Sequence, residues 1–342
     1  MNPYPSTLTP SPAVAEDLRA LNVDALYQPL RPLRRIGGQQ GVEILLDDQT
    51  YDPKTNPLLD WVHRVALPGF QSLNRRLPVR DFCTVGTGTG TDALAAIEVF
   101  DPRLVALTDV EAATVDLAAR NVARNLRPGQ AVEIRCGVGD LLAPFSDAAG
   151  RFDLIYENLP NIPLTPIEQR RLLKGRNRAT YHSQREEVVP TAVRENLLEL
   201  HWLCLHQARP LLNAGGTVLS SIGARRPIAE ILGAMASEGF EQRLESFTWK
   251  IQSEPEEVIG GFAAHEQLHR GFHFYPVEAV EKAFEGLTSW SAATYAFELE
   301  AALEAEKLSA FEALERSRTG EAIAHTVLAL SSQVDDGSEA RR

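Results

Sequence analysis

Short apolar runs alternate with amphipathic stretches between residues 80 and 277. The apolar runs predict strands over residues 80–86, 103–109, 131–137, 151–158, 217–223, 242–252 and 271–277. In the stretches between them apolar residues recur at helical spacing, which predicts helices over residues 91–100, 111–125, 191–212 and 228–240. Strands and helices therefore alternate with short connections. This order is typical of an α/β fold with a doubly wound, mostly parallel sheet.

The two ends of the chain have a different pattern. Residues 1–15 are rich in Pro, Ser and Thr, which predicts a mobile arm, and residues 15–30 predict a helix. A hairpin over residues 41–53 and a helix over residues 57–70 are expected next. From residue 277 the chain is rich in Ala, Glu and Leu and predicts helices with a polar tail. We therefore expect three parts: an N-terminal arm and helix (1–42), an α/β domain (43–276) and a C-terminal helical extension (277–342).

Composition narrows the classes of partner. The 342 residues carry a net charge of −12, which disfavours binding to a nucleic-acid backbone. Three widely spaced cysteines, without Cys-x-x-Cys spacing, indicate a reducing compartment and no disulfide framework. The N-terminus lacks the features of a secretion signal, and no apolar run is long enough to span a membrane. We therefore expect a soluble cytoplasmic protein that binds neither membranes nor nucleic acids.

Three consecutive strand ends carry groups suited to a nucleoside. The sequence TVGTGTG places Gly86, Gly88 and Gly90 in the turn after the first strand, where glycine lets the backbone approach a ligand closely. Asp109 ends the second strand, where a carboxylate can accept both ribose hydroxyls. Asp140 follows the third strand and can meet an adenine amino group. Such sheets bind ligands at the carboxyl ends of their strands, so the three positions support one another.

The strand over residues 151–158 ends in the unusual sequence YENLPN. The side-chain oxygen of Asn158 and the backbone carbonyl of Leu159 can accept hydrogen bonds from an amine and aim its lone pair at an electrophile. Pro160 removes a competing donor and stiffens the turn. Glu157 can take a proton or hold a cation. The alternative is that Asn158 only caps the following turn.

Taken together, these motifs resemble those of class I S-adenosylmethionine-dependent methyltransferases over about residues 43–275. YENLPN is similar to the Asn-Pro-Pro-Tyr motif of the amino-methylating branch, which includes the protein-glutamine N5-methyltransferases. The resemblance implies a Rossmann-like, seven-stranded sheet with the last strand antiparallel, S-adenosylmethionine as cosubstrate, and methyl transfer to a small-molecule amine or amino acid. It implies cofactor contacts at Thr84, Gly86, Thr87, Gly88, Gly90, Asp109, Val110, Asp140, Leu141 and Asn158, and catalytic roles for Tyr156, Glu157, Asn158, Leu159 and Tyr181.

Three positions depart from the family pattern. Thr84 stands where an acid often helps to hold the methionine amine of the cofactor, Leu159 replaces a proline, and Asn161 replaces the aromatic residue that covers a planar acceptor. These departures keep a second reaction open, in which S-adenosylmethionine is the sole substrate. Its own amine would attack Cγ to give azetidine-2-carboxylate and methylthioadenosine, as the resemblance to bacterial azetidine-2-carboxylate synthases implies.

Other readings of the motifs are weaker. The glycine turn lacks the spacing of Gly-x-Gly-x-x-Gly, which disfavours a nicotinamide cofactor. A purely regulatory nucleoside-binding module would leave YENLPN without a role. The sequence HEQLH (residues 265–269) matches a zinc-protease pattern but lacks the spacing of a third ligand, so we expect no metal site.

Three further features have both a structural and a functional reading. Tyr156 and Tyr181 could place an aromatic face against the sulfonium or simply pack in the core. The Leu/Ala stripe of residues 297–315 predicts a docked helix or a homodimer face. The basic run of residues 170–178 is a solvated face or a site of attraction for an anionic substrate.

Overall fold

A mixed, mostly parallel sheet forms the centre of the protein. The computed structural model describes residues 18–47, 50–146, 152–172, 180–237, 239–266 and 271–334. Neighbouring strands follow the order β10, β12, β9, β6, β3, β4, β5. The bounds are β3 (Asp81–Val85), β4 (Leu104–Asp109), β5 (Glu133–Val138), β6 (Phe152–Glu157), β9 (Leu212–Gly223), β10 (Phe240–Ile251) and β12 (Ile323–Val334).

The direction of the strands confirms the predicted fold class. All pairings among β3, β4, β5, β6 and β9 are parallel. Only β12 runs against its neighbours, because it pairs antiparallel with both β9 and β10. The sheet therefore has seven long strands, of which the last in the chain is antiparallel.

Helices cover both faces of the sheet. Neighbouring residues of β3 point to opposite faces, so Phe82 belongs to one apolar cluster and Cys83 to the other. The Phe82 face packs against α1 (Leu67–Leu73), α2 (Thr91–Phe100) and α3 (Ala112–Asn125). The Cys83 face packs against α6 (Glu199–Ala208), α7 (Ile228–Met235) and the helices between residues 277 and 303. All five residues of β3 are buried, as expected for a parallel strand that is covered on both faces.

The N-terminal segment differs from the prediction. Residues 19–22 were expected to be helical but form β1 (Arg19–Asn22), which pairs antiparallel with β2 (Glu43–Leu46). The expected hairpin within residues 41–53 is therefore wrong, since β2 pairs with residues 19–22 instead. A 3-10 helix over Asp24–Leu30 buries Leu26 and Tyr27 and leads into this pairing. The predicted arm, residues 1–15, lies outside the described residues.

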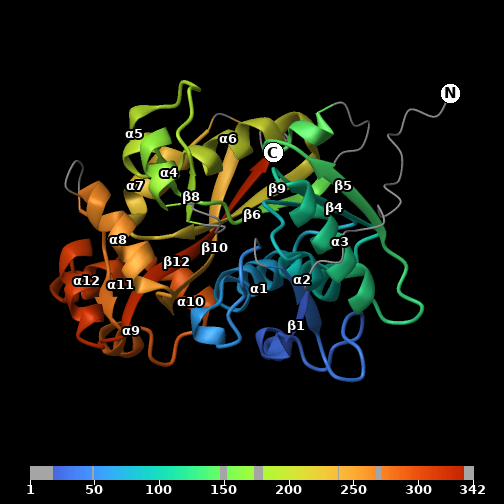
Figure 1. The fold of residues 1–342 in the computed structure, drawn as a ribbon, viewed down its shortest axis with the longest axis horizontal. Coiled ribbons are helices and arrows are strands. Elements are labelled where there is room, and N and C mark those ends of the chain that lie inside the picture. Colours follow the sequence, from blue (N-terminus) through green and yellow to red (C-terminus); the bar gives the residue numbers. More distant parts are fainter. Residues whose placement is uncertain are drawn as a thin grey trace, which may run out of the picture.

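The C-terminal segment brings the largest correction. Residues 277–318 form α9 (Val277–Ala283), α10 (Ser289–Thr294), α11 (Ala296–Leu303) and α12 (Ala310–Arg318), as expected. Residues 323–334, expected to be helical or tail, are instead β12, which is buried from Ile323 to Ser332 (Figure 1). The strand expected over residues 271–277 shrinks to β11 (Tyr275–Pro276), paired with β12. A division at residue 276 therefore does not separate an extension from the sheet.

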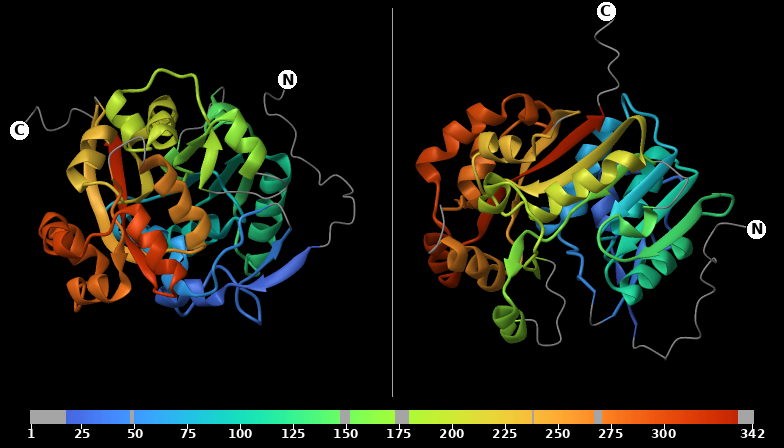
Figure 2. Two further views of the ribbon diagram at one scale, coloured as in Figure 1. Left: turned by 60° about the vertical axis from the view of Figure 1, so that its left-hand side comes forward. Right: turned by 90° about the horizontal axis from the view of Figure 1, so that it is seen from above.

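Shorter elements lie around the carboxyl ends of the parallel strands. The helix expected over residues 191–212 is interrupted at Leu197, whose φ is +57°, so α5 (Thr191–Glu195) and α6 are separate. A small parallel pair, β7 (Ile162–Leu164) and β8 (Tyr181–Ser183), stands beside α4 (Pro166–Leu172) and α8 (Pro255–Glu266). The right-hand view of Figure 2 shows the orange and red helices at one end of the sheet and the teal helices at the other. None of the described helices combines the length and apolarity needed to cross a membrane.

Candidate active site

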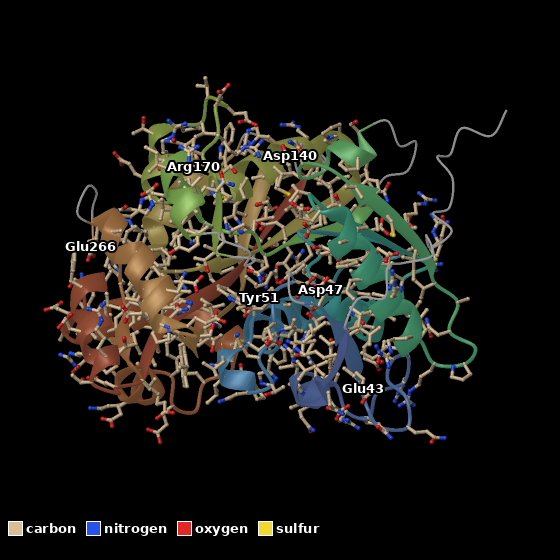
Figure 3. All side chains as sticks on the ribbon, viewed as in Figure 1. Glu43, Asp47, Tyr51, Asp140, Arg170 and Glu266 are labelled. Carbon is tan, nitrogen blue, oxygen red and sulfur yellow. The ribbon has the colours of Figure 1, made fainter. Side chains whose placement is uncertain are left out.

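A cavity of about 920 Å³ opens at the carboxyl ends of the parallel strands. Its size is within the range of small-molecule sites, and its position is the one where doubly wound sheets bind ligands. Figure 3 labels Tyr51, from the N-terminal segment, and Asp140, from the turn after β5, which both line it.

The glycine turn after β3 forms one wall of this cavity. Gly86 and Gly88 have φ values of +67° and +49°, which favour glycine, and both line the cavity with Thr87. The N–H groups of Gly86 and Thr87 donate to the carbonyl oxygen of Thr108 at 2.9 and 3.0 Å, which ties the turn to β4. The two glycines thus leave the backbone of the turn accessible to a ligand.

Two residues of the same motif do not line the cavity. Gly90 starts α2, and a Cβ there would lie 3.0 Å from the backbone oxygen of Ala118, so its role is close packing of α2 on α3. Thr84 is fully buried within β3, and its hydroxyl has no hydrogen-bond partner among the described residues. Their predicted contacts with a cofactor therefore have no support in the geometry.

Asp109 faces the glycine turn, as the ribose prediction requires. Its carboxylate accepts hydrogen bonds from the N–H groups of Gly88 (3.4 Å) and Glu111 (3.3 Å). Burial raises the pKa of this carboxyl, and the hydrogen bonds to the backbone oppose the shift. Asp109 and the exposed Val110 line the cavity next to the turn.

Asp140 lines the cavity, but its carboxylate is not free. Both oxygens accept from the guanidinium of Arg185 at 2.8 Å, and Glu187 also pairs with Arg185. A carboxylate oxygen has a second lone pair, so an adenine amino group would share Asp140 with Arg185. Leu141 follows with φ +49° and lines the same wall.

The end of β6 forms the wall beside the glycine turn. Asn158 lines the cavity, and its side chain makes no hydrogen bond with any described residue, so the turn-cap reading of Asn158 is wrong. Leu159 is nearly buried, and its Cδ2 lies 3.0 Å from the position of a Cβ on Gly86. Pro160 and Asn161 continue the wall. A free carboxamide thus stands directly beside the glycine turn.

Tyr156 and Glu157 do not reach the cavity themselves. Both are fully buried in β6. The Tyr156 hydroxyl accepts from Ser221 at 3.0 Å and donates to Asp92. The Glu157 carboxylate bonds Nδ1 of His201 at 2.7 Å. Direct catalytic roles for Tyr156 and Glu157 therefore have no support in this geometry, although each contacts a residue that lines the cavity.

Tyr181 lies on the segment that closes the cavity. Its ring lines the cavity while its hydroxyl donates to the backbone oxygen of Glu257 at 3.1 Å. This bond ties β8 to α8. The ring is therefore a rigid part of the wall.

Known proteins resemble this chain over part of its length. No family model matches the sequence. The release factor glutamine methyltransferase of Agrobacterium fabrum is 30% identical over 136 residues, which are 38% of this chain and 44% of that protein. The chain thus spans less than half the length of this curated relative.

Two solved structures are similar at lower identity. They are ribosomal protein L11 methylase from Lactobacillus delbrueckii subsp. bulgaricus (21% identical, 52% of this chain, 70% of that chain, TM-score 0.34) and TrmN from Thermus thermophilus (20%, 57%, 46%, TM-score 0.35). Because these scores are low, the fold assignment rests on the strand order and direction of the sheet. The chain has the class I methyltransferase fold. Its sequence is distantly similar to part of a release factor glutamine methyltransferase.

Two carboxylates in the wall, the buried Asp60 and the partly buried Asp92, were missed from the sequence. Burial raises the pKa of Asp60 to about 6, and burial followed by the charge of Asp60 raises the pKa of Asp92 to about 7. Asp60 accepts from the N–H groups of Val62 and His63, whereas Oδ1 of Asp92 has no partner among the described residues. The sequence did carry a signal, because Asp92 lies two residues after Gly90 in a helix that is mostly apolar.

The described residues of the HEQLH sequence, His265 and Glu266, do not line this cavity. Figure 3 shows Glu266 at the edge of the molecule, far from Tyr51 and Asp140. Its carboxylate accepts from the N–H groups of Phe272 (2.7 Å) and Ala310 (2.9 Å), so it joins α8 to α12. His269 lies outside the described residues. Within the described part of the chain, His, Cys, Asp and Glu form no group of three or more suited to a metal ion.

Proposed function

We propose that the protein is an S-adenosylmethionine-dependent methyltransferase that acts on an amine nitrogen of a small molecule. The observation that carries the proposal is the free Asn158 carboxamide beside the glycine turn. The relative from Agrobacterium fabrum is also a methyltransferase by name. When bound, S-adenosylmethionine supplies a methyl group on a positively charged sulfur.

The cavity offers suitable residues for both the adenosine part and the methionine part of S-adenosylmethionine. Gly86 and Gly88 offer a close backbone approach, and Asp109 offers two acceptor oxygens for ribose hydroxyls. Asp92 offers an unpaired, buried oxygen for the ammonium group of the methionine part, with Asp60 adding negative charge. These two carboxylates take the place of the acid that is missing at Thr84.

Asn158 and Leu159 position the nucleophile. Two acceptors, Oδ1 of Asn158 and the carbonyl of Leu159, hold the N–H bonds of a neutral amine so that its lone pair points at the methyl carbon. As the new N–C bond forms, the C–S bond breaks and its electron pair stays on sulfur. His201 lines the cavity, and its Nδ1 is held by Glu157, which leaves Nε2 to accept the proton that the amine gives up.

The cyclisation of S-adenosylmethionine remains the second candidate. It is favoured by Asn161, which lines the cavity where the family has an aromatic acceptor cover. Asn158 would then orient the cofactor's own amine toward Cγ. The products would be azetidine-2-carboxylate and methylthioadenosine.

One incubation separates the two reactions. Pure protein is mixed with methyl-labelled S-adenosylmethionine, with and without a pool of small amines, and the nucleoside product is identified by mass spectrometry. Methyl transfer predicts S-adenosylhomocysteine and a labelled amine, only when the pool is present. Methylthioadenosine above a boiled control, without any amine, would contradict methyl transfer and support cyclisation. Absence of both products would contradict both proposals.

A further inference from the structure

Arg225 is a cavity residue that the proposed chemistry does not use. It follows β9 and lines the cavity, yet only 5% of it is exposed to solvent. Its Nη2 donates to Oε1 of Gln252 (2.9 Å) and to Nε2 of His325 (2.8 Å), which are both neutral acceptors. Its Nε has no hydrogen-bond partner among the described residues. A buried guanidinium is thus held in place without being neutralised.

No carboxylate in the described part of the chain forms an ion pair with Arg225. Burial alone lowers the pKa of Arg225 to about 9, and no acidic group opposes that shift. A second buried cation, Lys250, lies close enough for Arg225 to depress its pKa further after burial. Asp60 partly offsets the charge of Lys250, but not that of Arg225. Burying a charged group without a counter-ion costs free energy. This arrangement therefore suits a ligand that brings a negative charge.

The neighbouring Arg226 is an equally buried arginine whose contacts are all structural. Its guanidinium donates to Asn196 (3.2 Å), to the carbonyl oxygen of Gly271 (2.6 Å) and to Glu230 (2.6 Å). It is as buried as Arg225 but does not line the cavity. Its partners come from three different segments, and one of them neutralises it.

Strand order places Arg225 on the acceptor side of the cavity. The glycine turn follows β3, Asn158 follows β6 and Arg225 follows β9, and these three strands are consecutive neighbours. Adjacent strands are about 4.8 Å apart, so Arg225 lies roughly 10 Å from the glycine turn along the sheet edge. Asn158 stands between them. This spacing matches a ligand whose amine and carboxylate lie a few bonds apart.

We propose that Arg225 binds the carboxylate of an amino-acid group held in the cavity. This inference rests on the proposed function and names the group recognised. The carboxylate belongs either to the methionine part of the cofactor or to a separate amino-acid acceptor. Both N–H bonds of Nη2 already donate to Gln252 and His325, so the carboxylate would accept from Nη1, which makes no hydrogen bond with a described residue.

Binding to purified Arg225→Gln distinguishes the two sources by calorimetry. If the carboxylate is the cofactor's, the variant binds S-adenosylhomocysteine at least tenfold more weakly than the parent but keeps its affinity for methylthioadenosine, which has no carboxylate. If it is the acceptor's, the affinity for S-adenosylhomocysteine is unchanged. In this case the parent, at saturating S-adenosylhomocysteine, binds at least one of the twenty L-amino acids at least tenfold more tightly than the α-carboxamide of the same amino acid. Arg225→Gln loses this preference.

Control measurements separate loss of the carboxylate site from loss of the folded structure. Retained methylthioadenosine binding shows that Arg225→Gln is folded, and Arg225→Lys, which keeps the charge, should recover part of any lost affinity. Arg226→Gln should leave both arms unchanged even if its melting temperature falls. Equal behaviour of Arg225→Gln and parent in both arms would overturn the carboxylate site while leaving the methyltransferase proposal standing. Failure of the parent to bind either nucleoside would overturn both.

Discussion

Asn158 is the side chain on which turnover should depend most. Because its amide acts on the nucleophile and not on adenosine, Asn158→Ala should lower kcat by about 100-fold or more. The affinity for S-adenosylhomocysteine should stay within about twofold of the parent. Steady-state kinetics and calorimetry measure the two quantities separately, and an unchanged kcat would remove Asn158 from the mechanism.

Asp92 should control the pH dependence of cofactor binding. Its pKa of about 7 means that the charged form, which attracts an ammonium group, gains population as the pH rises from about 6 to 8. Affinity for S-adenosylhomocysteine should therefore increase over this range, and Asp92→Asn should abolish most of the increase. Methylthioadenosine, which lacks the ammonium group, should show little pH dependence with either protein. A rise of equal size for both nucleosides would contradict the assignment.

The same carboxyl should make the unliganded protein less stable at high pH. Its pKa in the folded state exceeds the unfolded value, so between about pH 4 and 7 the folded form binds more protons than the unfolded form. The free energy of unfolding therefore falls as the pH rises through this range. At pH 8, Asp92→Asn should raise it by about 1 kcal/mol or more relative to the parent. Urea unfolding at pH 5 and pH 8 checks this, and a variant less stable than the parent at pH 8 would contradict it.

At the scale of elements, the ion pair between Arg185 and Asp140 joins two segments that line the cavity. It joins the segment after β8 to the turn after β5, across the predicted adenine site. Arg185→Gln should increase the dissociation rate of S-adenosylhomocysteine several-fold while changing stability by no more than about 1 kcal/mol, since the pair is partly exposed. Stopped-flow displacement gives the rate. Arg316→Gln, which breaks an exposed pair with Glu321, is the matched control and should leave the rate unchanged.

The sequence predicted elements best where local pattern and tertiary environment agree. The predicted helix over residues 91–100 is α2 to the residue, because the apolar spacing and the glycine turn both mark its bounds. β12 was missed because the Ala/Leu-rich stretch before it suggested more helix, and nothing local shows that a strand will insert between β9 and β10. Asp109 and Asn158 could be placed, since strand ends share one edge of the sheet. The environments of Asp60, Asp92 and Arg225 could not, because they depend on burial of a charged group without an ion-pair partner, which only packing reveals.

At the scale of the whole molecule, the C-terminal strand belongs to the core. Leu328 is fully buried between β9 and β10, so Leu328→Ala should lower the free energy of unfolding by about 2–5 kcal/mol. Phe311→Ala is the matched control, because Phe311 is 43% exposed on α12 and should cost less than about 0.5 kcal/mol. Urea titration measures both, and a small loss for Leu328→Ala would contradict the seven-stranded sheet.

The predicted stripe of residues 297–315 is largely used within the chain. Leu299 and Leu303 pack into the main core, and Leu314 packs with α8. The docked-helix reading is therefore confirmed. A homodimer through the C-terminal helices, on which Phe297 and Phe311 remain exposed, stays a prediction.

The central claim is that the cavity binds an S-adenosyl nucleoside with its ribose on Asp109. Titration of S-adenosylhomocysteine into the parent, Asp109→Ala and Asp116→Ala by calorimetry tests it most directly. Asp116 is the matched control, because it lies on the adjacent α3, pairs with Arg120 and does not line the cavity. We expect saturable one-to-one binding to the parent and to Asp116→Ala, and a loss of at least tenfold in affinity for Asp109→Ala. No binding to the parent, or equal affinities for parent and Asp109→Ala, would contradict the account.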